Sequence, residues 1–363
     1  MIRILQCVNN MHRAGLETML MNYYRNIDRT RIQFDFLTHR PDRSDYDDEI
    51  EALGGRIYRA PRLYPQNYPA YFAYMKQFFR EHPEYRIVHS HIDAMSYLPL
   101  LAAKKSGVPV RIAHSHSTSI DRDMKYPIKQ FFRYRIPQTA THYVACGERA
   151  GEFLFRGTPF SVIPNAIDMD AFFEDETVRR EKREELGLGD RFAVGHIGRF
   201  SYPKNHTFLL EIFAQITKRR KDAVLLLVGT GEKENEIRRL TYENGLEQKV
   251  LFLGNRSDVA QLYQAMDVFV MPSLFEGVPL VGIEAQTAGL PCFFSEAVPQ
   301  EVQITGNCVF LPLNKSPEEW ANRIVEGNAI NRESVGIALK NSKYNIRCAS
   351  GMLEEMYFGL VEQ

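Results

Sequence analysis

Short apolar segments, rich in β-branched residues, alternate with longer amphipathic segments along the whole chain. Five such runs lie in the first half, among them IRILQCV and FDFLT, and five more follow residue 165, among them AVLLLVG and DVFVMPS. Strands that alternate with helices form parallel sheets covered by helices on both faces. At 363 residues the chain exceeds what one hydrophobic core usually serves. The pattern therefore predicts an α/β protein with two Rossmann-like, doubly wound domains.

A Pro-Asn turn marks the boundary between the two series of strands. It lies in VIPNAIDMDAF, residues 162–172, directly after the last strand of the first series. We therefore expect domains at 1–165 and 166–343. Residues 344–363 carry apolar side chains at helical spacing, and we expect this helix to cross back and pack on the first domain.

Composition favours an ordinary soluble protein, with 44% hydrophobic and 25% charged residues. No apolar run reaches the roughly 18 residues of a membrane span, and the first apolar run is too short for a signal peptide. The expected location is cytoplasmic. The five cysteines are odd in number and form no CxxC pair, so we expect reduced thiols rather than a disulfide framework or a zinc site.

Charge is distributed unevenly between the halves. Residues 1–165 hold 23 Lys and Arg against 16 Asp and Glu, a net +7, whereas residues 166–363 hold 22 against 29, a net −7. The basic half is compatible with a phosphorylated ligand or a membrane surface, and equally with no function. Its segment 122–137, RDMKYPIKQFFRYRIP, mixes basic and aromatic side chains. Such a segment lies on an anionic membrane or packs its aromatic face inside the fold, and both interpretations stay open.

Two glutamates flank an expected helix start in LFEGVPLVGIEAQTAGLP. Glu276 and Glu284 are eight positions apart, and Pro279 between them suits the first position of a helix. Free N–H groups at a helix start bind anions, and carboxylates beside such a site accept hydrogen bonds from sugar hydroxyls. The pair predicts a ligand with a sugar on each side of a diphosphate, although solvated side chains are the commoner explanation. The candidate residues of the helix start are Gly277, Val278, Pro279 and Leu280.

Three further loops follow strands of the second half, where parallel sheets bind ligands. Arg199 and Lys204 in RFSYPKN could neutralise a diphosphate. Gly229 in GTGE allows a close backbone approach, and the backbone around Arg256 in NRSD could bind the edge of a base. Taken singly, Arg199 and Lys204 are more often a solvated surface pair and NRSD is more often a tight loop, whereas a plain turn explains GTGE equally well.

With these loops in order, the chain resembles the retaining glycosyltransferases of the GT-B fold that carry an E-x7-E motif, a family that includes bacterial capsule, exopolysaccharide and glycolipid transferases. The resemblance rests on SLFEGVPLVGIEAQTAGLP, on GRFSYPKN and on LYQAMDVFVMPS. It implies two domains that face each other across a cleft. It also implies that Glu284 binds the ribose, that Glu276 binds hydroxyls of the donor sugar, and that Arg199 and Lys204 hold the diphosphate.

The resemblance further implies the reaction. Such an enzyme moves a sugar from a nucleotide-diphosphate sugar, most often a UDP-sugar, onto a glycan or a lipid-linked acceptor in surface polysaccharide synthesis. The resemblance also implies that it needs no metal and no other cofactor. Nucleic acid is not an expected partner, and peripheral contact of segment 122–137 with the inner face of the plasma membrane stays open.

The first half resembles the acceptor domain of these enzymes. Its first loop, NNMHRAGLETML, keeps Gly15 but has Ala14 where many relatives have a second glycine. We expect the backbone at Gly15 to approach a phosphate of the donor, less closely than two glycines would allow.

Two His-x-His pairs end strands of the first half, His89 with His91 and His114 with His116. Alternation places each pair on one face of its strand, and without an evident third ligand hydrogen bonding is the commoner outcome than a metal site. The resemblance implies that His116 contacts the donor sugar or the acceptor. His91 and His114 are candidates for the acceptor side.

Two other functions remain open on the sequence. One is a GT-B nucleotide-sugar epimerase or hydrolase, which consumes the donor without an acceptor. The other is a non-catalytic, glycosyltransferase-like subunit that binds a partner enzyme; loss of Glu276, Arg199 or Lys204 would favour it, and all three are present.

Overall fold

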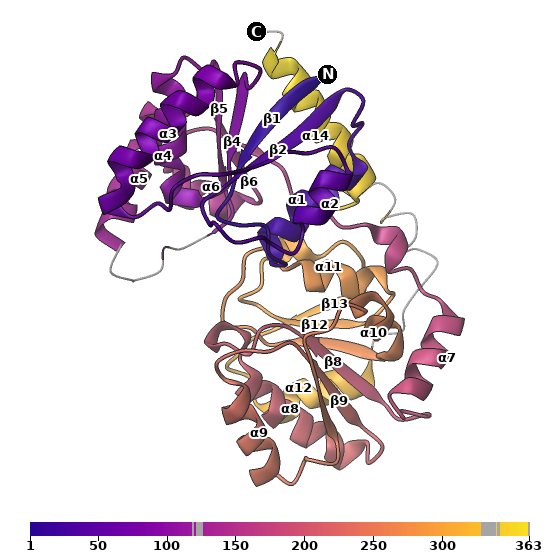
Figure 1. The fold of residues 1–363 in the computed structure, drawn as a ribbon. Coiled ribbons are helices and arrows are strands. Elements are labelled where there is room, and N and C mark those ends of the chain that lie inside the picture. The colour runs from indigo at the N-terminus through magenta and orange to yellow at the C-terminus, as the bar shows by residue number, and fades with distance from the viewer. Residues whose placement is uncertain (118–119, 121–125, 328–338, 340–341, 362–363) are drawn as a thin grey trace. The chain divides into compact units, whose positions relative to one another are not determined.

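A computed structural model describes residues 1–117, 120, 126–327, 339 and 342–361 (Figure 1). The chain forms two compact units. Unit 1 contains Met1–Ala166 together with Ile346–Gln363, and unit 2 contains Ile167–Asn345. No helix of the described residues is both long enough and apolar enough to cross a bilayer.

Unit 1 is built on a seven-stranded sheet in the order β3-β2-β1-β4-β5-β6-β7, with every neighbouring pair parallel. Its strands are β1 (Ile2–Cys7), β2 (Ile32–Thr38), β3 (Ile57–Arg59), β4 (Ile87–Ser90), β5 (Val110–Ser115), β6 (His142–Ala145) and β7 (Ser161–Val162). Its helices are α1 (Gly15–Asn26), α2 (Asp47–Ala52), α3 (Tyr68–Glu81), α4 (Tyr97–Lys105), α5 (Tyr126–Arg135), α6 (Glu148–Phe155) and α14 (Ile346–Val361).

Unit 2 is built on a six-stranded parallel sheet in the order β10-β9-β8-β11-β12-β13. Its strands are β8 (Ala193–Ile197), β9 (Val224–Val228), β10 (Val250–Gly254), β11 (Val268–Met271), β12 (Cys292–Ser295) and β13 (Cys308–Leu311). Its helices are α7 (Glu176–Glu185), α8 (His206–Arg219), α9 (Glu234–Glu243), α10 (Val259–Ala265), α11 (Leu280–Thr287) and α12 (Pro317–Glu326).

Both sheets bury their two faces, which explains why their strands read as continuous apolar runs. In β1, Leu5 and Cys7 belong to one core cluster, whereas Ile4 belongs to the cluster on the opposite face. In β9, Leu226 and its neighbour Leu225 divide in the same way. Successive side chains of a strand point to opposite faces, so a strand covered on both sides is apolar at most positions. The predicted α/β class with two doubly wound units is confirmed.

Local signals fix several helix starts in unit 2. The side chain of Asp175 accepts hydrogen bonds from the N–H groups of Thr177 and Val178 at the start of α7. At α12, Ser316 and Glu319 form a reciprocal capping box. Such caps satisfy N–H groups that lack a partner within the helix.

The last described helix, α14, belongs to unit 1 although it follows unit 2 in the sequence. It lies beside α1 and the first strands, where its yellow ribbon meets the indigo start of the chain (Figure 1). Ile346, Leu353 and Tyr357 are buried in the core cluster that also holds Ile4 and Phe34. The helix begins at Ile346, two residues after the expected start at residue 344.

Candidate functional site

In unit 2 the chain direction across the sheet reverses between β8 and β11. From β8 the connections proceed to β9 and β10 on one side, and from β11 to β12 and β13 on the other. Loops that leave the carboxyl ends of two such strands diverge, and the space between them is where open α/β sheets bind ligands. The RFSYPKN segment follows β8 and the LFEGVP segment follows β11. The fold thus brings the predicted diphosphate and sugar residues to one place.

Backbone contacts hold these two loops together. The N–H of Leu274 donates to the carbonyl of Pro203 at 2.8 Å, and the side-chain amide of Asn205 donates to the carbonyl of Pro272 at 3.1 Å. Asn205 adopts a left-handed conformation, with φ of 55°, directly before α8. Asparagine tolerates this region better than most residues. The sequence analysis did not single out Asn205, although an asparagine after a Pro-Lys turn is a recognisable turn signal.

Lys204 and Glu276 form an ion pair between the loops. The Nζ of Lys204 lies 2.6 Å from Oε1 of Glu276, and the two side chains are only 18% and 12% exposed. A poorly solvated pair of this kind depends on both partners, because each charge is left uncompensated without the other. The sequence suggested separate partners for the two residues, a phosphate and a sugar, and the structure places them in contact.

Arg199 extends from the same loop toward solvent. Its side chain is 73% exposed and its guanidinium lies 3.1 Å from Glu232, the last residue of GTGE. Gly229 in that motif has a φ of +129°, and a Cβ there would lie 2.2 Å from the carbonyl oxygen of Gly198. The glycine therefore permits backbone contact between the loops after β8 and β9, which a plain turn does not require.

Glu284 lies on the second turn of α11, beside a buried tyrosine. The hydroxyl of Tyr263 donates to Oε2 of Glu284 at 2.9 Å and lies 3.0 Å from the carbonyl of Val281. Loss of solvation raises the pKa of Glu284 to about 7, and the bond from Tyr263 opposes that shift. The sequence analysis did not single out Tyr263. The available signal was a tyrosine in the apolar stripe of LYQAMD, because a buried tyrosine hydroxyl needs a polar partner.

The helix start differs by one residue from the prediction. α11 begins at Leu280, and Pro279 precedes it as the capping residue with extended backbone. The N–H of Gly282 already donates to the carbonyl of Pro279, at 3.0 Å. Gly277 is exposed and Val278 is partly buried, so both lie in the loop between Glu276 and the helix.

Arg256 is engaged within unit 2. Its guanidinium forms two bonds to Asp258, at 2.7 and 2.6 Å, and one to Glu185 at 3.0 Å. A forked ion pair of this kind fixes the side chain and stabilises the loop after β10. Contact between the backbone here and a base stays a prediction.

In unit 1, the four histidines of the two His-x-His pairs form one cluster at the carboxyl ends of β4 and β5. His89 Nε2 lies 3.0 Å from His114 Nδ1, and His91 Nδ1 lies 3.0 Å from His116 Nε2. The rings stack within each pair, with centroids 4.2 Å apart for His89 and His91 and 4.0 Å apart for His114 and His116. Burial lowers the pKa of His116 to about 3 and that of His89 to about 3, so the rings are neutral.

Three of these histidines, His89, His91 and His114, offer nitrogen atoms that lie within 4.8 Å of one another. A metal ion lies in the plane of each imidazole that binds it, so parallel stacked rings cannot share an ion without turning. The stacking favours hydrogen bonding within the cluster.

Gly15 is the first residue of α1 and is exposed, with Ala14 as the preceding cap. No described atom lies within 4 Å of the position where a Cβ would stand. The helix start at Gly15 therefore leaves its backbone open on this side. Approach of a phosphate stays a prediction.

The basic and aromatic segment 122–137 contains α5; residues 122–125 lie outside the described part of the chain. Phe132 is buried and stacks on Tyr97 with ring centroids 5.0 Å apart. Phe131 and Tyr134 are 50% and 59% exposed. One aromatic ring of this segment thus packs inside the fold and two face solvent, and contact with a membrane stays a prediction.

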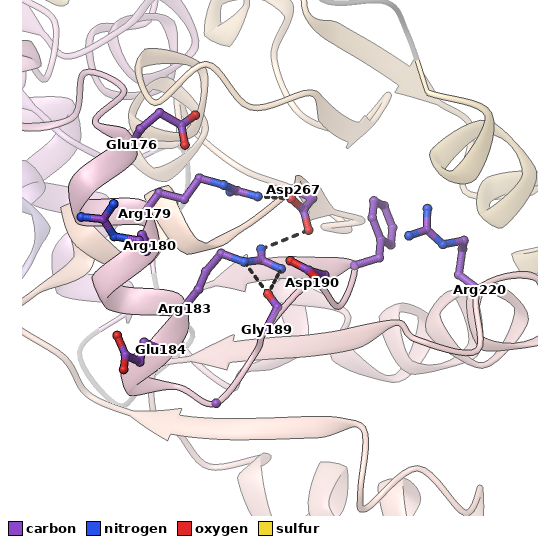
Figure 2. A pocket seen from close by; sticks show the side chains of 11 residues that line it. Glu176, Arg179, Arg180, Arg183, Glu184, Gly189, Asp190, Arg220 and Asp267 are labelled. Carbon is purple, nitrogen blue, oxygen red and sulfur yellow. Dashed lines mark hydrogen bonds and ion pairs between the residues drawn. The ribbon is translucent and has the colours of Figure 1, made fainter.

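A cavity of about 880 Å³ in unit 2 lies at the amino ends of the strands, next to the starts of β8 and β11 (Figure 2). Arg179 and Arg183 reach Asp267, just before β11, with separations of 2.6 and 3.3 Å. Both also donate to backbone carbonyls, Arg179 to Met266 and Arg183 to Gly189. These arginines brace α7 against the sheet, and the cavity is separate from the strand ends that carry Lys204 and Glu276.

Comparison with known proteins agrees with this arrangement. Residues 13–171 match the family Glycosyltransferase Family 4, and residues 191–327 match the family Glycosyl transferases group 1. A protein of Bacillus subtilis (strain 168) named as a glycosyltransferase, EpsF, is 36% identical over 98% of this chain and 96% of its own length. An Escherichia coli protein named UDP-Gal:alpha-D-GlcNAc-diphosphoundecaprenol alpha-1,3-galactosyltransferase is 30% identical over 58% of each chain.

Solved structures share the fold. HepE of Anabaena, in complex with UDP and glucose, superposes with a TM-score of 0.80 at 18% identity and covers 98% of this chain and 99% of its own. WaaG, a glycosyltransferase involved in lipopolysaccharide biosynthesis, has a TM-score of 0.63 at 15% identity, with 96% and 95% covered. The full-length match to EpsF shows the family, and the chain belongs to the family 4 and group 1 glycosyltransferases with the GT-B fold.

Proposed function

We propose that this glycosyltransferase is a retaining hexosyltransferase that moves a sugar from UDP onto a glycan or lipid-linked acceptor in surface polysaccharide synthesis. The observation that carries the proposal is the contact between Lys204 and Glu276, in the loops that follow the adjacent strands β8 and β11. HepE, whose fold this chain shares, was solved with UDP and with UDP-glucose, and the E. coli relative is named for a UDP-Gal donor and a diphosphoundecaprenol acceptor.

In this proposal the cations of the loop after β8 receive the diphosphate. Lys204 exchanges its contact with Glu276 for a phosphate oxygen, and the exposed Arg199 exchanges Glu232 for another. Charge that develops on the departing UDP is then stabilised by fixed positive groups. We propose that these side chains perform the role a divalent metal has in other transferases, so that turnover needs no added metal.

The two glutamates bind the sugars on either side of that diphosphate. Glu284, already a hydrogen-bond acceptor for Tyr263, accepts from ribose hydroxyls. Glu276, once released from Lys204, accepts from hydroxyls of the donor sugar. Neither acts as a nucleophile. The acceptor attacks on the face that UDP leaves, and the leaving phosphate takes the acceptor's proton.

Unit 1 is proposed to bind the acceptor, with His116 beside the transferred sugar. The exposed aromatic residues Phe131 and Tyr134 of α5, with the exposed Arg135, form a surface suited to an anionic membrane. Sedimentation with vesicles that contain an anionic lipid, compared with neutral vesicles, tests this part. Equal sedimentation with both kinds would contradict it.

Thermal unfolding with UDP, GDP, ADP and their sugar conjugates, without added metal, tests the donor site. A ligand present at about 100 times its dissociation constant stabilises the folded state by about 2.7 kcal/mol. We expect this shift with UDP and its conjugates, and a second assay then follows UDP release. UDP release that depends on a lipid-linked or glycan acceptor supports a transferase, whereas release without an acceptor identifies a hydrolase. If no nucleotide shifts the unfolding temperature, the protein is a non-catalytic subunit.

A further inference from the structure

A hydrogen-bonded chain runs from the C-terminal helix α14 to the histidine cluster of unit 1. Tyr357 of α14 is 1% exposed, and its hydroxyl contacts Nδ1 of His89 at 2.7 Å and Nε2 of Gln6 at 3.2 Å. Gln6, on strand β1 beside β4, also contacts Nε2 of His91 through its Oε1, at 2.8 Å. Tyr357 and Gln6 thus contact both histidines of the first pair, and His89 and His91 in turn contact His114 and His116.

The amide of Gln6 gives the first branch of this chain a direction. Its nitrogen only donates, so the oxygen of Tyr357 accepts and the phenol turns its own proton toward Nδ1 of His89. A neutral imidazole that accepts at Nδ1 carries its proton on Nε2. His89 therefore donates from Nε2 to Nδ1 of His114, and His114 carries its own proton on Nε2 as well. That Nε2 is buried and has no hydrogen-bond partner in the described part of the chain.

The second branch has the same polarity. The oxygen of Gln6 only accepts, so His91 donates to it from Nε2 and is left with a bare Nδ1. His116 then donates from Nε2 to that Nδ1, at 3.0 Å. His116 is therefore left with a bare Nδ1, and among the described residues this atom has no partner. Of the four Nδ1 atoms, the other three each accept a bond within the network.

The ring of His116 is also fixed in orientation. It stacks on His114 with an interplanar angle of 27°. Its backbone N–H donates to Oδ1 of Asp93 at 2.8 Å, and Asp93 holds a left-handed conformation with φ of 46°. A single tautomer on a fixed ring presents one kind of hydrogen-bonding group. A bare nitrogen accepts from a hydroxyl and repels a phosphate oxygen.

We propose that Gln6 and Tyr357 are positioning residues that hold the four histidines in the Nε2–H tautomer, so that His116 offers Nδ1 as an acceptor for a sugar hydroxyl. The identity of that hydroxyl rests on the proposed function. The tautomer assignment rests only on contacts within unit 1. Because Tyr357 stands on α14, the segment after unit 2 sets the chemistry of a strand-end histidine in unit 1.

Nitrogen-15 spectroscopy of the histidine rings tests the assignment without any turnover. In the intact protein at neutral pH, His91 and His116 are expected to carry a proton on Nε2 only. In Tyr357→Phe the amide of Gln6 loses the acceptor that holds its orientation and can turn over, so both rings are expected to exchange between two tautomers. Gln6→Met removes the acceptor for His91 directly and serves as the second variant if Tyr357→Phe does not fold.

The matched control is Tyr23→Phe. Tyr23 belongs to the same core cluster, and its buried phenol donates to the carbonyl of Pro164 at 2.6 Å rather than to a histidine. It is expected to lose stability without any change in the histidine tautomers. A proton on Nδ1 of His116 in the intact protein, or the same tautomer exchange in Tyr23→Phe, would overturn the proposal.

Turnover then separates positioning from structure. Tyr357→Phe is expected to lower kcat about tenfold, the effect of one hydrogen bond, with the KM for the nucleotide sugar within about twofold of the parent. Tyr23→Phe is expected to keep kcat. An unchanged kcat in Tyr357→Phe despite tautomer exchange would overturn the positioning role. If the parent shows the expected tautomers but transfers no sugar, the proposed function fails and the assignment stands.

Discussion

At the scale of single residues, the pair of Lys204 and Glu276 compensates two charges that the fold partly removes from water. In the free protein the two side chains are paired with each other, and Nζ of Lys204 lies 2.6 Å from Oε1 of Glu276. In the proposed function a diphosphate competes with Glu276 for the ammonium of Lys204. A donor sugar would likewise compete with Lys204 for the carboxylate, so that one bound ligand would satisfy both groups.

This competition predicts opposite effects on binding and turnover for Glu276→Gln. The neutral amide releases Lys204, so UDP should bind as tightly as to the parent or more tightly, whereas kcat should fall about 100-fold through loss of a charged contact to the sugar. Calorimetric titration with UDP and initial rates measure the two quantities. Glu247→Gln, at an exposed glutamate of the same unit, is the control. Weaker UDP binding in Glu276→Gln would contradict the competition.

Glu284 predicts a pH dependence of stability. Its pKa rises from the ordinary value of 4.5 to about 7 on folding. Between these values the unfolded chain loses the proton and the folded chain keeps it, so the free energy of unfolding falls as the pH rises through this window, by up to about 3 kcal/mol. Glu284→Gln removes this contribution. Chemical unfolding of both proteins across the window should give curves that diverge toward acid pH, with the parent gaining stability; parallel curves would refute the shift.

At the scale of elements, the segments that follow β8 and β9 are joined by backbone hydrogen bonds, so the position of each depends on the other. The N–H of Gly198 donates to the carbonyl of Val228 at 2.9 Å, and the N–H of Phe200 to the carbonyl of Thr230 at 3.0 Å. The glycine of GTGE makes this contact sterically possible. Arg199 is carried on one of the two loops, so its position depends on a glycine on the other.

Gly229→Ala is therefore expected to displace the loop that carries Arg199. The alanine would have to adopt a positive φ that L residues rarely adopt, and its Cβ would lie 2.2 Å from the carbonyl oxygen of Gly198. We expect a loss of stability of about 3 kcal/mol and weaker UDP binding. Gly245→Ala is the matched control. Gly245 also has a positive φ, of 64°, but an added Cβ meets no described atom within 4 Å, so only about 1 kcal/mol should be lost. Equal losses in the two variants would argue against the loop contact.

The sequence predicts this level of organisation well. Strand-helix alternation and the two glutamates place the β8 and β11 loops correctly, because local hydrophobic pattern and turn residues determine them. Side-chain partners are another matter. Lys204 and Glu276 are 72 positions apart, and Gln6 and Tyr357 are 351 apart. No local pattern encodes such pairs, because tertiary packing alone decides which polar groups meet.

At the scale of the whole molecule, unit 1 is assembled from two segments separated by all of unit 2. Helix α14 contributes Ile346, Ala349, Leu353 and Tyr357 to one of the two core clusters of unit 1. The N–H of Asp28 also donates to the side chain of Glu354 at 2.8 Å. The stability of unit 1 therefore depends on the packing of α14.

Leu353→Ala is expected to destabilise unit 1 by about 2–5 kcal/mol, since it opens a cavity in that core. Met352, the preceding residue, is 50% exposed, so Met352→Ala should leave stability within about 0.5 kcal/mol of the parent. Limited proteolysis with mass mapping distinguishes the units. Cleavage in Leu353→Ala should concentrate within 1–166 while fragments of 167–345 persist, and uniform cleavage of both units would contradict this division.

The placement of α14 also bears on how the chain is made. A ribosome releases residues 167–345 before residues 346–361, so every segment of unit 2 is available before unit 1 has its last helix. Domains usually fold in the order of their synthesis. Here the core cluster to which α14 contributes stays incomplete until residues 346–361 have been made. Of the two units, the one whose synthesis begins first is therefore the one that receives its α14 only after the other has been made.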